Sequence, residues 1–477
     1  MSNVTTNAQG PFRVCLVVDN PPRDLDGLVL IGDTLCKNGC EVFLVPMYAQ
    51  GYEIPSLRPD FVLLNYARYA NESLMRAYHR CGIGIGILDT EGAIWESRAQ
   101  YAKSIAIKAC EQYVHQYYFW GEAQRDILLE YSHMGTNTMT TTGSPRYDYY
   151  VEPWIKGIET IDSSFDGHLL FISNFALAYP RFATLEEEIE NHIRCGRTES
   201  YIKQRVCDER VARNNLIKLI ELFSNRYPNL KFVIRTHPFE NDDEYKIVFE
   251  NRDNVHIVRD HAVSSWLKAA RLVFHFTSSV AIDATLMKKP IYTLNWLSTN
   301  LLREMSPIAQ QLSYSIESED DFKAIIADGH ESVDSDSIPN EQAFDTLKQW
   351  YYLMDGLSHA RVSDQILKFL RGKDISVSHF RCIIEQICNS GSYGDWKSIC
   401  GGLGRRILGG HHYLKLRQKF RSLNQEAQMK TDKCFSCDQV NKILQRIEKA
   451  CPNNGDRTVR AFTSKVGESI LIKRISD

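Results

Sequence analysis

The residues best suited to chemistry form two groups in the middle of the chain. His237-Pro238 follows the apolar run Phe232–Ile234, and Thr277-Ser278-Ser279 follows the run Leu272–Phe276. An imidazole can donate to a phosphate oxygen as a nucleotide departs. Hydroxyl groups and the free N–H groups of a helix that begins beside them suit the same phosphate. The two groups therefore predict the binding site of a nucleotide or nucleotide sugar.

Both groups are expected at one edge of a parallel sheet. Three runs rich in β-branched residues alternate with helix-like segments: Phe232–Ile234, Val255–Val258 and Leu272–Phe276. This alternation is typical of a parallel sheet with crossover helices. Ligands of such sheets bind at the carboxyl ends of the strands. Arg235, at the end of the first run, is therefore predicted to contact the substrate.

Each of these residues also has a simpler interpretation. His237 could be hydrogen-bonded within a turn that Pro238 stiffens. Ser278 and Ser279 suit the cap of the following helix, a role compatible with phosphate binding. Asp283, one turn into that helix, either takes the ribose hydroxyls of the nucleotide or faces solvent.

Carboxylates follow two strand-like runs in the first 150 residues. Asp24 and Asp26 lie in the loop NPPRDLDG after the run 12–19, where they could bind substrate or cap the next helix. Asp89 and Glu91 follow the run CGIGIGIL, and uncompensated charge near a core is costly. Glu91 is therefore the leading candidate for a general acid or base in this half, and Asp89 for a substrate contact.

The glycines of CGIGIGILD (81–89) do not predict a dinucleotide-binding loop. They alternate inside an apolar strand rather than opening a helix. Strand glycines usually mark close packing. A tightly packed strand is therefore expected here.

Two βα domains follow one another in the sequence. Residues 1–160 are predicted to form a Rossmann-like, acceptor-side domain, and 161–330 a Rossmann-like domain that binds the nucleotide sugar. Residues 331–375 are predicted as bracing helices and 376–477 as a basic, mainly helical C-terminal extension. The predicted fold class is α/β and GT-B-like, with two Rossmann-like domains facing a cleft. Several epimerases and phosphorylases share this layout.

Composition predicts a cytoplasmic protein. No apolar run approaches the roughly 18 to 20 residues needed to span a bilayer. The first residues lack the features of a signal peptide. The 13 cysteines are scattered along the chain, as is typical of proteins whose thiols stay reduced. From Gly401 onward the chain has 16 Lys and Arg against 7 Asp and Glu, although its net charge is -3. This basic region predicts contact with an anionic surface such as the inner face of the cytoplasmic membrane; a solvated helical face is the alternative. No nucleic-acid partner is predicted.

No metal ion is predicted. Cys434 and Cys437 have the spacing of half a zinc knuckle, but no second pair follows at a matching distance, and structural zinc needs four ligands. No DxD-type motif stands in a setting suited to a metal-bound diphosphate.

Six segments resemble the bacterial surface carbohydrate biosynthesis protein family. They are RDLD (23–26), DTEG (89–92), TGSPRYD (142–148), LLFISNF (169–175), RTHPFEND (235–242) and FTSSVAIDATLMKKP (276–290). Through the His-Pro and Ser-Ser pairs the chain more distantly resembles the β-Kdo transferases of capsule and O-antigen synthesis. The resemblance covers about residues 10 to 330. Thr236 and Phe239 flank the His-Pro where those relatives vary, so the donor sugar is not specified.

This resemblance implies a retaining glycosyltransferase that needs neither a metal ion nor a cofactor. Its donor would be a CMP-activated sugar, and Kdo or a related ulosonic acid is the sugar expected first. The acceptor would be a glycan or glycolipid. His237, Ser278 and Ser279 would hold the CMP phosphate. Retention implies a carboxylate nucleophile, and Asp208 lies in the approximate place for it. The alternative interpretation needs no resemblance. Asp208 lies near the start of a helix expected over 211–224, and acids are common there because they interact favourably with the helix dipole.

Two other functions remain open from the sequence. CDP-glycerol glycerophosphotransferases carry a similar His-Pro and Ser-Ser pair, so phosphotransfer is one alternative. A non-catalytic polysaccharide-assembly protein that keeps the fold is the other.

Overall fold

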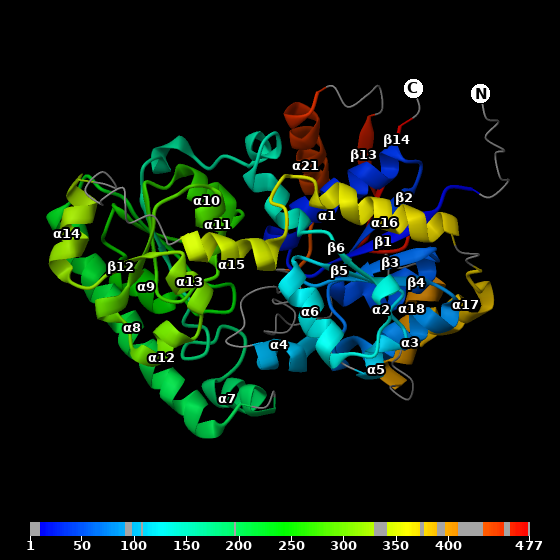
Figure 1. Ribbon diagram of the computed structural model, residues 1–477, viewed down its shortest axis with the longest axis horizontal. Coiled ribbons are helices and arrows are strands. Elements are labelled where there is room, and N and C mark those ends of the chain that lie inside the picture. Colours follow the sequence, from blue (N-terminus) through cyan, green and yellow to red (C-terminus); the bar gives the residue numbers. More distant parts are fainter. Residues whose placement is uncertain are drawn as a thin grey trace. The chain divides into compact units, whose positions relative to one another are not determined.

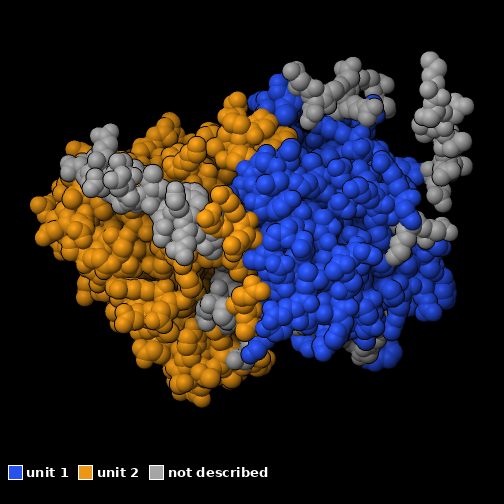
Figure 2. All heavy atoms as spheres, in the orientation of Figure 1, with its two compact units in different colours: residues 1–90, 102–149, 351–477 blue, residues 91–101, 150–350 orange. Residues whose placement is uncertain are grey.

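The computed structural model describes residues 10–90, 98–105, 108–194, 197–328, 341–372, 376–388, 396–408, 433–452 and 458–475. The chain divides into two compact units (Figure 2). Unit 1 comprises residues 1–90, 102–149 and 351–477, and unit 2 comprises residues 91–101 and 150–350. Each unit has its own mainly parallel sheet with helices (Figure 1). The predicted α/β class with two Rossmann-like domains is confirmed.

Six strands of unit 1 are parallel and lie in the order β2-β1-β3-β4-β5-β6. Leu16 of β1 pairs with Leu44 of β2 and Leu63 of β3. The chain runs from β1 to β2 on one side and then to β3 on the other, so the strand order reverses beside β1, where α/β sheets leave a crevice. The strands are β1 (Arg13–Val18), β2 (Glu41–Pro46), β3 (Phe61–Leu64), β4 (Gly84–Leu88), β5 (Gln116–Phe119) and β6 (Met139–Thr141). The helices before residue 150 are α1 (Pro21–Lys37), α2 (Gln50–Leu57), α3 (Glu72–Cys81), α4 (Arg98–Ile105, which crosses the division between the units), α5 (Lys108–Glu111) and α6 (Glu122–Tyr131).

Two of the three alternating glycines, Gly84 and Gly86, lie in strand β4, as predicted. Gly82 instead ends α3 with a positive φ of 81°, so the strand begins later than predicted. A Cβ atom on Gly84 would lie 2.5 Å from the ring of Phe369, and one on Gly86 would lie 2.5 Å from the ring of Phe61. Larger residues would therefore collide with aromatic side chains that pack on both positions. The prediction of close packing is confirmed.

The described residues of the C-terminal region are mainly helical, as predicted, and also complete the sheet of unit 1. Strand β14 (Ile470–Arg474) runs antiparallel to β2, pairing Ile472 with Val42, and β13 (Val459–Thr463) pairs with β14. Neither strand is predicted from the sequence, because each has only five residues and their partner β2 lies near the other end of the chain. Of the predicted bracing helices, α15 (Glu341–Tyr351) lies almost wholly in unit 2, whereas α16 (Ser358–Gly372) belongs to unit 1 and packs on α1. The remaining helices of unit 1 are α17 (His379–Ile387), α18 (Trp396–Leu408) and α21 (Cys437–Ala450).

The described strands of unit 2 form a parallel sheet in the order β12-β11-β10-β7-β8-β9, which reverses between β7 and β10. Stacked rings of Phe171 and Phe274, 4.9 Å apart, lie in its core. The strands are β7 (Leu169–Ile172), β8 (Phe232–Arg235), β9 (Val255–Val258), β10 (Leu272–His275), β11 (Ile291–Leu294) and β12 (Tyr314–Ile316). The helices are α7 (Leu185–Arg194), α8 (Glu199–Arg226), α9 (Asp243–Val248), α10 (Val263–Ala269), α11 (Val280–Leu286), α12 (Asn300–Glu304), α13 (Pro307–Gln311) and α14 (Glu319–Asp328).

Candidate functional site

The two predicted phosphate-binding groups lie at the same edge of the sheet of unit 2. His237 and Pro238 follow β8, and Thr277, Ser278 and Ser279 follow β10. Strand β7 lies between β8 and β10, so the groups flank the carboxyl end of β7, where the strand order reverses. Open α/β sheets bind their ligands at such a position.

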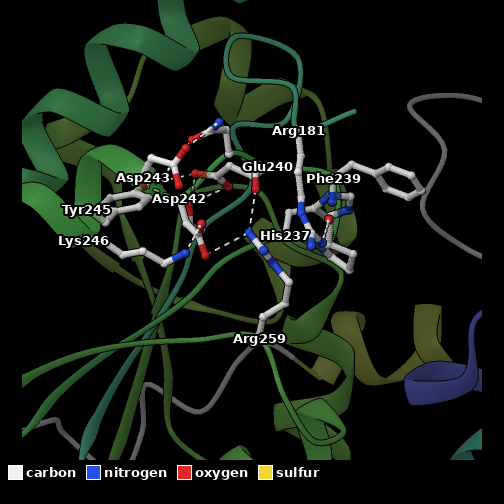
Figure 3. Close-up of polar contacts among 12 residues, drawn as sticks. Arg181, His237, Phe239, Glu240, Asp242, Asp243, Tyr245, Lys246 and Arg259 are labelled. Carbon is white, nitrogen blue, oxygen red and sulfur yellow. Dashed lines mark hydrogen bonds and ion pairs between the residues drawn. The ribbon is translucent and has the colours of Figure 1, made fainter. Parts of the chain in front are cut away.

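His237 is held by its own loop. Its Nδ1 atom accepts a hydrogen bond from the backbone N–H of Phe239 at 3.2 Å, so the hydrogen of the neutral ring lies on Nε2. Arg181 fixes the same loop, since its backbone N–H donates to the carbonyl of Phe239 at 2.9 Å and its Nη1 donates to the carbonyl of Pro238 at 3.3 Å (Figure 3). The half-buried imidazole can therefore donate from Nε2 to an anionic oxygen.

Glu240 anchors the loop to the end of β7. Its fully buried carboxylate accepts hydrogen bonds from Ser173 Oγ at 2.6 Å, the Phe175 N–H at 3.0 Å and the Tyr245 hydroxyl at 3.2 Å. Burial raises the pKa of the Glu240 carboxyl, and the bonds from Ser173 and Phe175 oppose that rise. The role of Glu240 is not predicted from the sequence, because no periodicity marks an acid as buried when it lies in a loop.

Arg213 of α8 is the cation nearest to this carboxylate. Its Nε lies 3.6 Å from Glu240 Oε1, and its guanidinium carbon lies 3.9 Å from the ring centre of Tyr179 and 4.2 Å from that of Tyr245. It also donates to the carbonyl of Asn241 at 3.2 Å. A planar guanidinium between two rings is a rigid arrangement that lysine cannot reproduce.

Arg259, just after β9, holds the loop from a third strand. Its Nη2 donates to the carbonyl of Glu240 at 2.7 Å and lies 3.1 Å from Asp242 Oδ2, and Lys246 also pairs with Asp242 (Figure 3). The loop that carries His237 is thus fixed by contacts from the ends of β7 and β9 and from α8.

The turn after β10 is organised by a buried histidine that the sequence analysis did not single out. His275 Nδ1 accepts the backbone N–H of Ser278 at 3.0 Å, and Nε2 contacts Ser313 Oγ at 2.8 Å. Burial lowers the pKa of His275 to about 3, so the ring is neutral. Ser278 Oγ in turn accepts the N–H of Val280 at 3.2 Å. Ser279 is the N-cap residue of α11, but its side chain makes no capping hydrogen bond. The Ser278 hydroxyl remains able to donate, whereas its N–H is already used by His275.

Two residues predicted at this site have other contacts. Asp283 is fully buried and accepts a hydrogen bond from the Tyr150 hydroxyl at 2.5 Å, so it does not face solvent. Its contact with a ribose stays a prediction. Arg235 donates to the carbonyls of Asp260 at 2.6 Å and His261 at 2.8 Å, and burial lowers its pKa to about 10. Its guanidinium therefore holds the loop after β9.

Asp208 lies well inside a helix rather than near its start. Helix α8 begins at Glu199, where Thr198 caps it, and not at Val211 as predicted. Asp208 accepts a hydrogen bond from Gln204 at 3.0 Å, and its buried neighbour Glu209 accepts bonds from Arg205 and the Ala178 N–H. The helix-dipole interpretation of Asp208 is therefore wrong, and its chemical role stays a prediction.

Unit 1 contains a pocket at its own strand reversal. It lies at the carboxyl ends of β1, β3 and β4. Asp89, which is 2% exposed, lines it and lies 3.5 Å from Arg68. The lining residues are Val17, Asp24, Gly27, Leu28, Leu63, Leu64, Asn65, Leu88, Asp89, Thr90, Trp120, Ser144, Pro145 and Arg146.

The predicted carboxylates of the first loop lie inside helix α1. This helix begins at Pro21 rather than near residue 27, because proline is well suited to the first turn of a helix. Asp24 accepts hydrogen bonds from the Asn20 N–H at 2.9 Å and from Arg23 Nε at 2.7 Å, and Asp26 pairs with Arg446 at 3.0 Å. Asp24 lines the pocket of unit 1. Glu91 lies outside the described residues.

Neither a metal-binding cluster nor a membrane-spanning helix occurs in the described ranges of the chain. Within these ranges no cluster of three or more His, Cys, Asp and Glu side chains is arranged to hold a metal ion. Cys437 Sγ instead donates to the carbonyl of Ala461 at 3.2 Å. Over the same part of the chain no helix is both long and apolar enough to cross a membrane.

Comparisons with known proteins yield distant structural likenesses. No family model and no curated protein matches the sequence. A putative UDP-N-acetylglucosamine 2-epimerase from Listeria monocytogenes is 12% identical, with a TM-score of 0.47 over 76% of this chain and 98% of its own. The UDP-GlcNAc 2-epimerase from Neisseria meningitidis is 13% identical, with a TM-score of 0.43 over 75% of this chain and 100% of its own. The wall teichoic acid polymerase TagF is 10% identical, with a TM-score of 0.44 over 77% of this chain and 91% of its own.

Proposed function

We propose that the chain is a glycosyltransferase of surface polysaccharide biosynthesis. It transfers a sugar, Kdo or a related ulosonic acid, from a CMP-activated donor to a glycan or glycolipid acceptor. The observation that carries the proposal is the position of His237 on one side of β7 and of the Thr277 and Ser278 hydroxyls on the other. A single phosphate between nucleoside and sugar needs few donors, and these residues provide an imidazole and two hydroxyls.

In the transfer, the bond between the anomeric carbon and the phosphate oxygen breaks and CMP leaves with the electron pair. His237 Nε2–H and the Ser278 hydroxyl donate to the phosphate oxygens on which charge develops. Retention requires that a carboxylate first attacks the anomeric carbon and forms a sugar–enzyme intermediate. The acceptor hydroxyl then attacks this intermediate and the first carboxylate leaves. A second, ionised carboxylate takes up the proton of the hydroxyl. Glu91 and Asp208 are the candidates for these two roles.

We assign the acceptor to the pocket of unit 1. Asn65, Asp89 and Thr90 offer polar atoms to sugar hydroxyls, while Leu63, Leu88 and Trp120 offer apolar surface to the sugar ring. A sugar has both kinds of surface, so this mixed lining supports the assignment.

The test is thermal unfolding with CMP, CMP-Kdo, UDP and CDP-glycerol. CMP and CMP-Kdo are expected to raise the Tm, and His237→Ala is expected to remove most of that rise. His192→Ala, which replaces a half-buried histidine on α7 of the same unit, is the matched control and should keep the rise in Tm.

A rise in Tm with CDP-glycerol, followed by mass-spectrometric detection of glycerophosphate on a polyol-phosphate acceptor, would instead establish the phosphotransferase alternative. No rise with any cytidine nucleotide would overturn the proposal and favour a non-catalytic assembly protein.

A further inference from the structure

Large apolar side chains are exposed on helices α17 and α18 of unit 1. Phe380 is 69% exposed, Trp396 76% and Ile407 79%, and Leu403 and Leu408 are also exposed. The two helices pack against each other. Isolated exposed apolar residues are common on protein surfaces, but a group of five on one helix pair indicates a contact surface.

Helix α18 directs its apolar side away from the protein. Trp396, Cys400, Leu403 and Ile407 follow one another at intervals of four, three and four residues, so they form one stripe along the helix, and all four are exposed. Gly402 is buried, and a Cβ there would lie 2.1 Å from the carbonyl oxygen of Ile387 at the end of α17. The helix therefore packs through a glycine and leaves its apolar stripe in water.

The same two helices are basic. Lys397, Arg405 and Arg406 lie in α18, which has no acidic residue, and α17 carries the exposed Arg381. Glu385 is the one acid of α17, and it is buried. Arg406 reaches Gln386 of α17 at 2.5 Å. The surface thus combines apolar side chains with cations and exposes no carboxylate of these helices.

We propose that this surface, formed by Phe380, Trp396, Leu403 and Ile407 with Arg381 and Arg406, docks on a bilayer that contains anionic phospholipid. An indole ring suits the headgroup level, and aliphatic side chains suit the boundary with the acyl chains. Arginine stems can lie along the apolar layer while their guanidinium groups reach lipid phosphates. A second copy of the chain is the poorer occupant, because a symmetric contact would bring the same cations together. This docking is independent of the proposed transfer reaction.

The experiment is sedimentation of the full chain with vesicles. One set contains phosphatidylcholine alone and the other phosphatidylcholine mixed with phosphatidylglycerol. The wild type is expected to sediment with the mixed vesicles, and the double variant Leu403→Glu, Ile407→Glu should lower the bound fraction about tenfold or more. Ile247→Glu on α9 of unit 2 is the matched control, since Ile247 is 73% exposed outside this surface. It should bind as the wild type does.

Three results would overturn the proposal. The first is failure of the wild type to sediment with mixed vesicles. The second is sedimentation of the double variant to the same extent as the wild type. The third is a wild type that is a dimer and a double variant that is a monomer in size-exclusion chromatography, while both bind vesicles equally. That result would identify the surface as a contact between copies of the chain. Both variants replace exposed side chains, so an unchanged Tm verifies that they fold.

Discussion

The Ser173 hydroxyl lies 2.6 Å and 2.7 Å from the two carboxylate oxygens of Glu240. This contact joins the end of β7 to the loop that carries His237, three residues before Glu240. Because Arg213 and Arg259 contact the same loop, the position of the imidazole depends on a buried network rather than on the loop alone.

Glu240→Gln should loosen this network. The amide group would place an NH₂ where the carboxylate now accepts hydrogen bonds, so we expect a loss of about 1–3 kcal/mol in the free energy of unfolding. The protection that CMP gives should also weaken. Urea unfolding with and without CMP measures both effects. Glu244→Gln is the control, since Glu244 pairs with the same Arg213 but its side chain is 48% exposed, and an equal loss in both variants would contradict the role given to Glu240.

His275 predicts a dependence of stability on pH. Its folded pKa of about 3 lies below the value of about 6.5 expected in the unfolded chain. The unfolded chain therefore binds a proton first as the pH falls. The stability that neutral His275 contributes is complete above about pH 6.5 and is lost as the pH falls toward 3.

His275→Gln should therefore flatten the fall in unfolding free energy between about pH 7 and about pH 5. Urea unfolding at both pH values measures this slope. The exposed His133→Gln should keep the slope of the wild type. If His275→Gln keeps it too, another group causes the pH dependence.

Gly86→Ala should destabilise unit 1. The added Cβ would lie 2.5 Å from Phe61 Cζ and 3.2 Å from Tyr118 Cε2, and overpacking of this kind costs about 1–3 kcal/mol. Thermal unfolding monitored by circular dichroism measures the loss. Gly372→Ala, where an added Cβ meets no atom within 4 Å, should have the stability of the wild type. A neutral Gly86→Ala would show that β4 can accommodate the side chain.

Ile472→Ala tests whether β14 is an integral part of unit 1. Ile472 is fully buried and its carbonyl accepts a hydrogen bond from Cys36 Sγ at 3.2 Å. Truncation should cost about 2–5 kcal/mol, measured by urea unfolding. Ile475→Ala, at a position that is 39% exposed, should cost much less. Equal stability of the two variants would mean that the sheet of unit 1 folds without its C-terminal strands.

Local sequence patterns were sufficient to predict several features of the fold and of the candidate site. Apolar runs punctuated by polar residues predicted the parallel strands, and with them the common edge of His237 and Ser278. Alternating glycines in an apolar run predicted the close packing of β4. In each case the signal lies within a few neighbouring residues, and strand ends in a parallel sheet are brought together by the topology itself.

Only the tertiary structure decided which polar groups are occupied by other contacts. It placed Asp24 and Asp26 inside α1 and Asp283 against Tyr150, and it gave Glu240 and His275 their positions beside the site. It also joined β14 to β2. These outcomes depend on contacts between residues far apart in the chain. Burial and partner choice follow from packing of the whole unit, which local sequence does not encode.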